Sequence, residues 1–130
     1  MKQSEPAKHL YEYAVLRYVP RVEREEFINV GLVMMCKRRR WLHLEYRLDP
    51  AKMDAFKAQH TIEELSGRLD CLRSVALGKG NAGPIAQLEA EERFRWIAAV
   101  KSSCLQVSRP HPGLCEDLDS TFSRIFEEQV

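Results

Sequence analysis

The sequence predicts an α+β fold, in which helices pack on a mostly antiparallel sheet of about four strands. Three observations support this prediction. Strand-like segments fill most of residues 11–48, and helical segments with capping residues follow them up to residue 99. A further strand-like segment and a closing helix complete the pattern. Strands that come first and are then followed by helices favour α+β over an alternating α/β architecture.

The first two predicted strands cover residues 11–19 and 27–36, with a charged connection between them. The first is rich in aromatic and β-branched residues, and Pro20 ends it because proline has no backbone donor. The second is apolar on both of its alternating faces except at Asn29 and Gly31. That pattern is typical of a central strand that is covered on both sides.

The third predicted strand covers residues 41–48 and forms an antiparallel hairpin with the second. The basic link Lys37–Arg40 lacks an Asn-Gly turn, so we expect a longer or bulged connection. Apolar and polar residues alternate cleanly along this strand. One face carries Leu42, Leu44, Tyr46 and Leu48, and the other carries Trp41, His43, Glu45 and Arg47.

Helices are predicted after Asp49 and after Thr61, both of which suit an N-cap. Asp49 precedes a proline, which favours the first helical position, and this helix is short, ending near Ala58. Thr61 and Glu64 form a capping box. The second helix carries apolar residues at spacings of three and four and ends at Gly78.

The remaining predicted elements are a helix around residues 89–99, a fourth strand over 102–108 and a closing helix over 117–128. Two prolines and a glycine within residues 110–113 predict a break in regular structure before that last helix.

The glycine-rich segment Gly78–Pro84 matches the pattern G-x-G-x-x-G of phosphate-binding loops. Such loops need a strand before them and a helix N-terminus after them, so that free N–H groups point at the anion. Here a predicted helix precedes the segment and Pro84 removes a donor. We therefore predict a linker whose first glycine caps a helix.

Length and composition indicate a single α+β domain over residues 10–130, preceded by a polar leader over residues 1–9 that we expect to be mobile. Of 130 residues, 45% are hydrophobic and 30% are charged, which excludes a wholly disordered chain. The formal charge of +1 excludes strong global steering towards nucleic acid or anionic membranes. The longest apolar run, Val30–Cys36, is far shorter than the roughly 20 residues that span a bilayer. No apolar stretch follows the N-terminal charge, so we expect a cytoplasmic protein without a membrane partner.

The four cysteines are Cys36, Cys71, Cys104 and Cys115, and none belongs to a C-x-x-C pair. We interpret them as small hydrophobic residues in a reducing compartment, with a metal site or a disulfide as the alternative. We predict no metal and no cofactor.

Seven basic residues dominate the charge of the first part of the chain. They are Arg17, Arg21, Arg24, Lys37, Arg38, Arg39 and Arg40. Such a basic edge could bind the phosphates of a nucleic acid, with nearby aromatic side chains stacking on bases. The alternative is a solvated turn whose charges protect the sheet from edge pairing.

His43 and Glu45 share one face of the third strand, and a histidine beside a carboxylate can act as a general base. Together with His111, which lies between two prolines, they suggest a small hydrolase or phosphotransfer enzyme. The sequence places no serine or cysteine nucleophile beside them. We therefore favour the solvated face of a hairpin and predict no catalytic residue.

Asn29 and Gly31 interrupt a run that is otherwise suited to burial. A glycine inside a strand often marks a bulge or the close approach of another backbone, and a buried asparagine must be hydrogen-bonded. Two interpretations stay open. One is a ligand pocket or a contact to a partner strand, and the other is a structural bulge.

Two blocks of the sequence resemble a known family. The block Glu26–Gly31 (E-F-I-N-V-G) follows a tyrosine-rich strand, and the block Glu92–Trp96 (E-R-F-R-W) precedes the segments Ser103–Gln106 and Pro110–Gly113. Over residues 10–129 the chain resembles domain-of-unknown-function family 3037. The resemblance implies a small bacterial cytoplasmic protein encoded beside HipA-like kinases, and hence a partner role. It brings no catalytic residues with it.

We predict a non-catalytic protein-binding module, with a HipA-like kinase as a candidate partner. The expected contact surface lies around Asn29, Gly31, Arg93 and Trp96. The alternatives are nucleic-acid binding through the seven basic residues and an enzyme that uses His43, Glu45 or His111.

Overall fold

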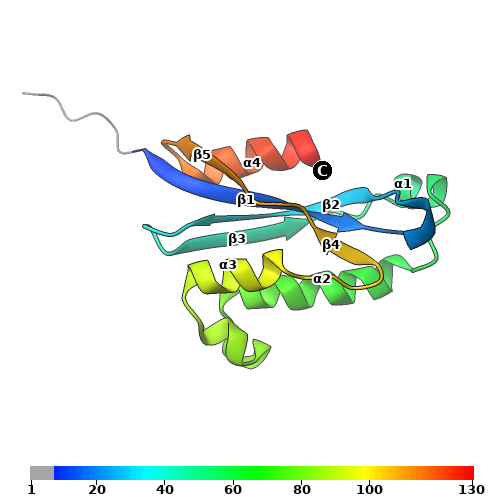
Figure 1. Cartoon of the computed structure of the whole chain (residues 1–130), viewed down its shortest axis with the longest axis horizontal. Coiled ribbons are helices and arrows are strands. Elements are labelled where there is room, and N and C mark those ends of the chain that lie inside the picture. The colour runs from blue at the N-terminus through cyan, green and yellow to red at the C-terminus, as the bar shows by residue number, and fades with distance from the viewer. Residues whose placement is uncertain (1–7) are drawn as a thin grey trace, which may run out of the picture.

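The computed structural model describes residues 8–130, and it contains a five-stranded antiparallel sheet with helices on both of its faces (Figure 1). The strands are β1 (His9–Tyr18), β2 (Ile28–Cys36), β3 (Trp41–Tyr46), β4 (Leu105–Val107) and β5 (His111–Cys115). The helices are α1 (Pro50–Ala55), α2 (Ile62–Leu77), α3 (Ala90–Ala98) and α4 (Leu118–Gln129). Short 3-10 turns are η1 (Val22–Arg24), η2 (Gly80–Ala82) and η3 (Pro84–Gln87). The predicted α+β class is confirmed.

The strands lie in the order β3-β2-β1, and β4 and β5 both pair with β1 on its other side. Strand β2 is therefore central, as its apolar faces predict. Helices α2 and α3 cover one face of the sheet and α4 covers the other (Figure 1). Because side chains alternate along a strand, β1 contributes Leu16 and Tyr18 to the core under α2 and Tyr11 and Val15 to the core under α4.

A β-bulge lies at Val30, as the second interpretation of Asn29 and Gly31 predicts. Leu16 pairs with Gly31, but Arg17 pairs with Asn29, so Val30 is the extra residue of β2. A Cβ on Gly31 would lie 2.8 Å from Leu16 Cδ1 and 2.9 Å from the backbone oxygen of Glu45. The glycine is therefore needed for the close approach of three strands.

The predicted helix caps Asp49, Thr61 and Gly78 are confirmed. The Asp49 carboxylate accepts a hydrogen bond from Ala51 N at 2.9 Å, and the Thr61 hydroxyl accepts one from Glu64 N at 3.1 Å. Gly78 ends α2 with φ +71°, so the glycine-rich segment begins as a helix cap and continues as two 3-10 turns. Helix α1 ends at Ala55, three residues before the predicted end.

The predicted break at residues 110–113 is wrong, because three of these residues, 111–113, belong to the fifth strand. Pro112 lies opposite Glu12 at the edge of the sheet, where its missing N–H costs no ladder bond. Gly113 pairs with Tyr11, whose ring covers it. The fourth strand is shorter than predicted and spans Leu105–Val107 only.

Strand β1 begins at His9, so the last residue of the predicted leader belongs to the sheet. Residues 1–7 of that leader lie outside the described residues. Among the helices of residues 8–130, none combines the length and the apolar character needed to cross a membrane.

Candidate functional site

The structure does not bring the four residues of the expected partner surface together. Gly31 is packed inside the sheet. Asn29 lies on the α4 side, where its Nδ2 donates to the backbone oxygen of Gln129 at 3.0 Å. Arg93 and Trp96 lie on α3, across the sheet. The surface as predicted is therefore not continuous.

Arg93 caps helix α2. Its Nη1 donates to the backbone oxygens of Ala76 at 2.7 Å and Val75 at 3.4 Å, at the helix end where carbonyl groups lack partners. Trp96 is 43% exposed and lines a cavity beside α2. Of these two residues, only Trp96 presents a large free surface.

Six of the seven basic residues form two groups at opposite ends of β2. The turn Lys37–Arg40 follows β2, whereas Arg21 and Arg24 precede it, and a strand of nine residues separates them by roughly 26 Å. Lys37 pairs with Glu91 at 3.1 Å, next to the acidic start of α3. The arginine groups do not make one continuous basic edge.

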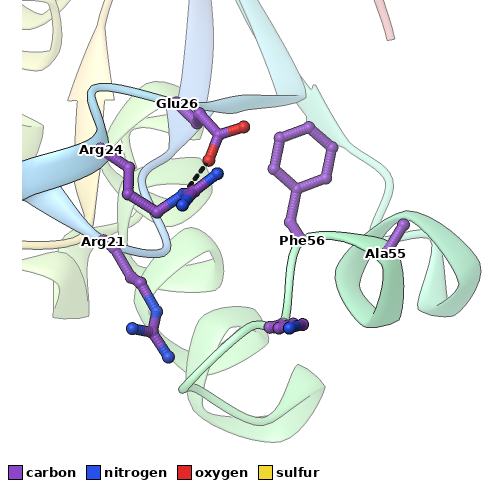
Figure 2. A pocket seen from close by; sticks show the side chains of 6 residues that line it. Arg21, Arg24, Glu26, Ala55 and Phe56 are labelled. Atoms are coloured by element: carbon purple, nitrogen blue, oxygen red, sulfur yellow. Dashed lines mark hydrogen bonds and ion pairs between the residues drawn. The ribbon is translucent and has the colours of Figure 1, made fainter.

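Arg21 and Arg24 line a cavity of about 300 Å³ between the β1–β2 connection and the end of α1 (Figure 2). Arg24 Nε pairs with the Glu26 carboxylate, and this hydrogen bond raises the pKa of the Arg24 guanidinium above its usual value. Arg17 lies apart from them, with its guanidinium 4.2 Å from the centre of the Phe27 ring.

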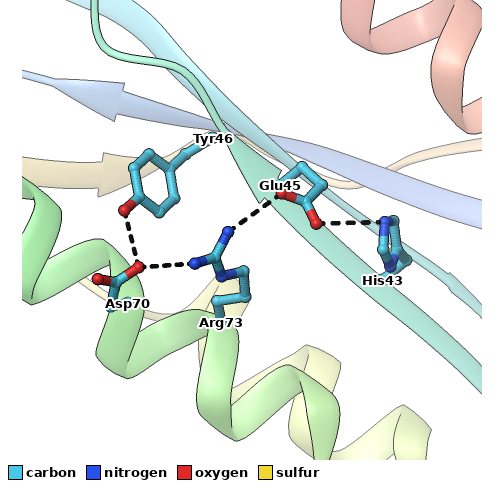
Figure 3. A network of polar contacts seen from close by, with 5 residues as sticks. All are labelled: His43, Glu45, Tyr46, Asp70 and Arg73. Carbon is cyan, nitrogen blue, oxygen red and sulfur yellow. Dashed lines mark hydrogen bonds and ion pairs between the residues drawn. The ribbon is translucent and has the colours of Figure 1, made fainter.

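Strand β3 forms one edge of the sheet, and it carries a network of polar contacts with helix α2 (Figure 3). Arg73 of α2 contacts Glu45 at 3.3 Å and Asp70 at 3.0 Å, and the Tyr46 hydroxyl donates to Asp70 at 2.7 Å. Burial, with a further contribution from the Asp70 hydrogen bond, raises the pKa of Tyr46. Glu45 and Tyr46 point to opposite faces of β3, so Arg73 reaches around the edge of the strand.

His43 and Glu45 lie together, as the enzyme hypothesis requires, with 3.6 Å between Nε2 and Oε1. They line a cavity of about 370 Å³ that Phe122, Ser123 and other residues of α4 close on its far side. The predicted solvated face of the hairpin is therefore partly covered, because the centroids of the Phe122 and His43 rings are 4.6 Å apart.

Ser123 is the hydroxyl group that the sequence could not place near His43. Within residues 8–130 no hydrogen bond joins the two side chains, so the cavity holds a histidine–carboxylate pair without an aligned nucleophile. His111 lies on β5, where it packs against Tyr13 instead. Over the same residues, no group of three or more His, Cys, Asp or Glu side chains could hold a metal ion.

The backbone of β3 offers a feature that residue patterns did not reveal. Arg47 N donates to Val30 O at 2.7 Å, and hydrogen-bonded pairs alternate along an antiparallel ladder. The N–H and C=O groups of Leu42, Leu44 and Tyr46 therefore point away from β2. In the part of the chain that the structure describes, no other strand pairs with this edge.

The opposite edge of the sheet is protected. Strand β4 has three residues, and β5 contains Pro112, which has no N–H to offer. Strand β3 has six residues and neither proline nor glycine. An incoming extended segment would therefore find unpaired backbone groups at β3, once the side chains that leave Leu44 only 1% exposed move aside.

These features define a class: a small α+β protein whose antiparallel sheet carries helices on both faces and whose β3 strand has no partner on its outer side within the described residues. Residues 13–130 match the family described as protein of unknown function (DUF3037), and the chain belongs to this family. No curated protein matches the chain, and no solved structure does.

Proposed function

We propose that the protein is a non-catalytic protein-binding module that accepts an extended segment of a partner as an added strand beside β3. The unpaired edge of β3 carries this proposal. Its outward-facing backbone groups at Leu42, Leu44 and Tyr46 would form the main-chain ladder that gives such complexes their affinity.

The cavity between β3 and α4 would supply sequence preference. It lies beside the same strand and combines the aromatic rings of Phe122 and Phe126 with the charged groups of Arg47 and Glu127. Arg47 contacts Glu127 at 3.3 Å, and its guanidinium lies over the Phe126 ring. The cavity therefore combines a charged pair with an aromatic surface beneath it. This arrangement suits one side chain of the added strand with an apolar stem and a polar end.

The first partner to examine is the HipA-like kinase that the family resemblance suggests. A bacterial cytoplasmic setting belongs to the same proposal. It is supported by the cysteines, because all four are free thiols and two of them, Cys36 and Cys104, are buried as small hydrophobic residues.

The two alternatives have weaker support. Nucleic-acid binding through one basic edge is disfavoured by the separation of the turn Lys37–Arg40 from Arg21 and Arg24. An enzyme that uses His43 and Glu45 would need a nucleophile or a bound substrate group aligned with the imidazole.

Proline substitution at the two edges tests the proposal. Leu42→Pro removes one outward-facing N–H from β3, and Leu114→Pro removes one from β5, where Leu114 is 63% exposed. We expect Leu42→Pro to reduce capture of the kinase at least tenfold and Leu114→Pro to leave it within twofold. Circular dichroism confirms that both variants are folded before the capture is measured. Equal capture by the two folded variants would contradict the proposal.

A further inference from the structure

The cavity beside Arg21 and Arg24 has the charge of an anion site. Its lining residues are Arg21, Arg24, Glu26, Ala55, Phe56 and Lys57, so three cations face one carboxylate. The ion pairs found among residues 8–130 involve neither Arg21 nor Lys57. Arg21 and Lys57 therefore have no ion-pair partner among these residues, while Glu23, which is not part of the lining, adds a second negative charge near Arg24.

Glu26 orients Arg24 without consuming its binding capacity. The carboxylate accepts from Nε, and the two terminal nitrogens of the guanidinium keep their hydrogens for another acceptor (Figure 2). A guanidinium that is fixed along one edge loses less freedom when it binds a phosphate with the other. The single carboxylate of the cavity thus positions a cation.

Lys57 occupies a backbone conformation that favours glycine. It follows α1 with φ +53°, and Lys57 N and Ala58 N donate to Asp54 O and Met53 O, both at 3.0 Å. This is the hydrogen-bond pattern of a helix end in which the left-handed position is usually glycine. The lysine places an ammonium group at the cavity although its backbone conformation is less favourable for lysine than for glycine.

Phe56 adds a flat apolar wall. The residue is 37% exposed, and its ring stands on the far side of the cavity from Arg21 and Arg24 (Figure 2). Aromatic faces of this kind stack on the rings of bound bases. Cations on one side and an aromatic face on the other would suit a ligand with a phosphate group and a ring.

We propose that this cavity binds a small phosphorylated ligand, with the phosphate held by Arg21, Arg24 and Lys57. The phosphate is the shared chemistry of two sources, a free anion such as pyrophosphate and a nucleotide such as ADP. Phe56 would contact the ring of the nucleotide. The site is independent of the β3 edge, which lies elsewhere on the sheet.

Titration of the full chain with ADP and with pyrophosphate, each followed by calorimetry at low salt, tests the site. The double variant Arg21→Gln/Lys57→Gly removes two cations from the cavity. Its matched control, Arg38→Gln/Arg39→Gln, removes two cations from the turn at the other end of β2. We expect at least tenfold weaker binding by the first variant and a change below twofold for the control.

Stability separates loss of the site from loss of the fold. Because glycine suits the left-handed position, Lys57→Gly should unfold at the same or a higher temperature than the native chain while binding more weakly. Phe56→Leu distinguishes the two sources. If it weakens ADP and spares pyrophosphate, the ligand is a nucleotide; if it changes neither, the site recognises the phosphate alone.

Two results would overturn the proposal. One is the absence of binding of either probe at about 1 mM, a concentration at which even a weak site is half occupied. The other is equal weakening by the cavity variant and by its control, which would show that only net charge matters.

Discussion

At the scale of single residues, position 31 of β2 has room for a hydrogen atom only. A side chain there would meet Leu16 from β1 and both the Glu45 oxygen and the Tyr46 Cβ from β3. The sequence indicated that Asn29 and Gly31 were unusual, and the structure explains the glycine by packing rather than by ligand binding.

Substitution of this glycine should destabilise the fold. We expect Gly31→Ala to lower the free energy of unfolding by about 2–3 kcal/mol, because the backbone oxygen of Glu45 cannot move without disturbing β3. Gly67→Ala is the matched control, since Gly67 is exposed in α2 with no atom within 4 Å of the added methyl group. It should gain about 0.5–1 kcal/mol from helix propensity. Urea denaturation of both variants checks the pair, and a neutral Gly31→Ala would disprove the packing argument.

Arg93 shows where prediction from sequence stops at this scale. Its role as a cap depends on α3 lying over the end of α2, a contact between segments separated by the turns η2 and η3. No local pattern encodes that contact. The N-caps Asp49 and Thr61 were predictable because each bonds within two or three residues.

Among the elements, β1 to β3 could be predicted from the sequence, whereas β5 could not. Strands β1 to β3 have strong apolar or alternating patterns, and their pairing follows. Strand β5 has proline and glycine at its centre, and it forms because β1 offers a partner edge and Tyr11 covers Gly113. That stabilisation is long-range, so local preferences pointed to a break.

The edge of β3 is held by Arg73, which contacts Glu45 on one face of the strand and lies over the Tyr46 ring on the other. We expect Arg73→Ala to cost less than about 1 kcal/mol, because the pair is partly exposed and such pairs contribute little. Removing the side chain uncovers the end of the β3 edge, so affinity for an added strand should rise a few-fold.

Binding measurements on Arg73→Ala and Arg124→Ala test this role. Arg124 forms a comparable surface pair with Glu128 at 3.2 Å on α4, so its loss should leave the affinity unchanged. Weaker binding by Arg73→Ala alone would mean that the partner contacts Arg73 directly instead of displacing it.

At the scale of the whole molecule, the sheet separates surfaces that the sequence grouped together. The basic turn Lys37–Arg40 and the pair Arg21 and Arg24 share one half of the chain yet lie at opposite ends of β2. Asn29 contacts α4, whereas Arg93 and Trp96 lie with α3 on the other face. Fold class and most elements could be predicted from local patterns, but a shared surface depends on topology.

The same topology leaves the β3 edge as the place where another strand could be added. Each of the other strands pairs on both sides or belongs to a short or proline-containing edge, within the residues that the structure describes. The proposed function therefore depends on three backbone amides, those of Leu42, Leu44 and Tyr46.

Amide hydrogen exchange of these three residues, measured by NMR in the free protein and in its complex with the kinase, is the most direct test. We predict that the amides of Leu42 and Tyr46 exchange faster in the free protein than those of His43 and Glu45, which face β2, and that the complex slows all three outward-facing amides strongly. A complex that forms while these three amides exchange at their free rates would contradict strand addition at β3.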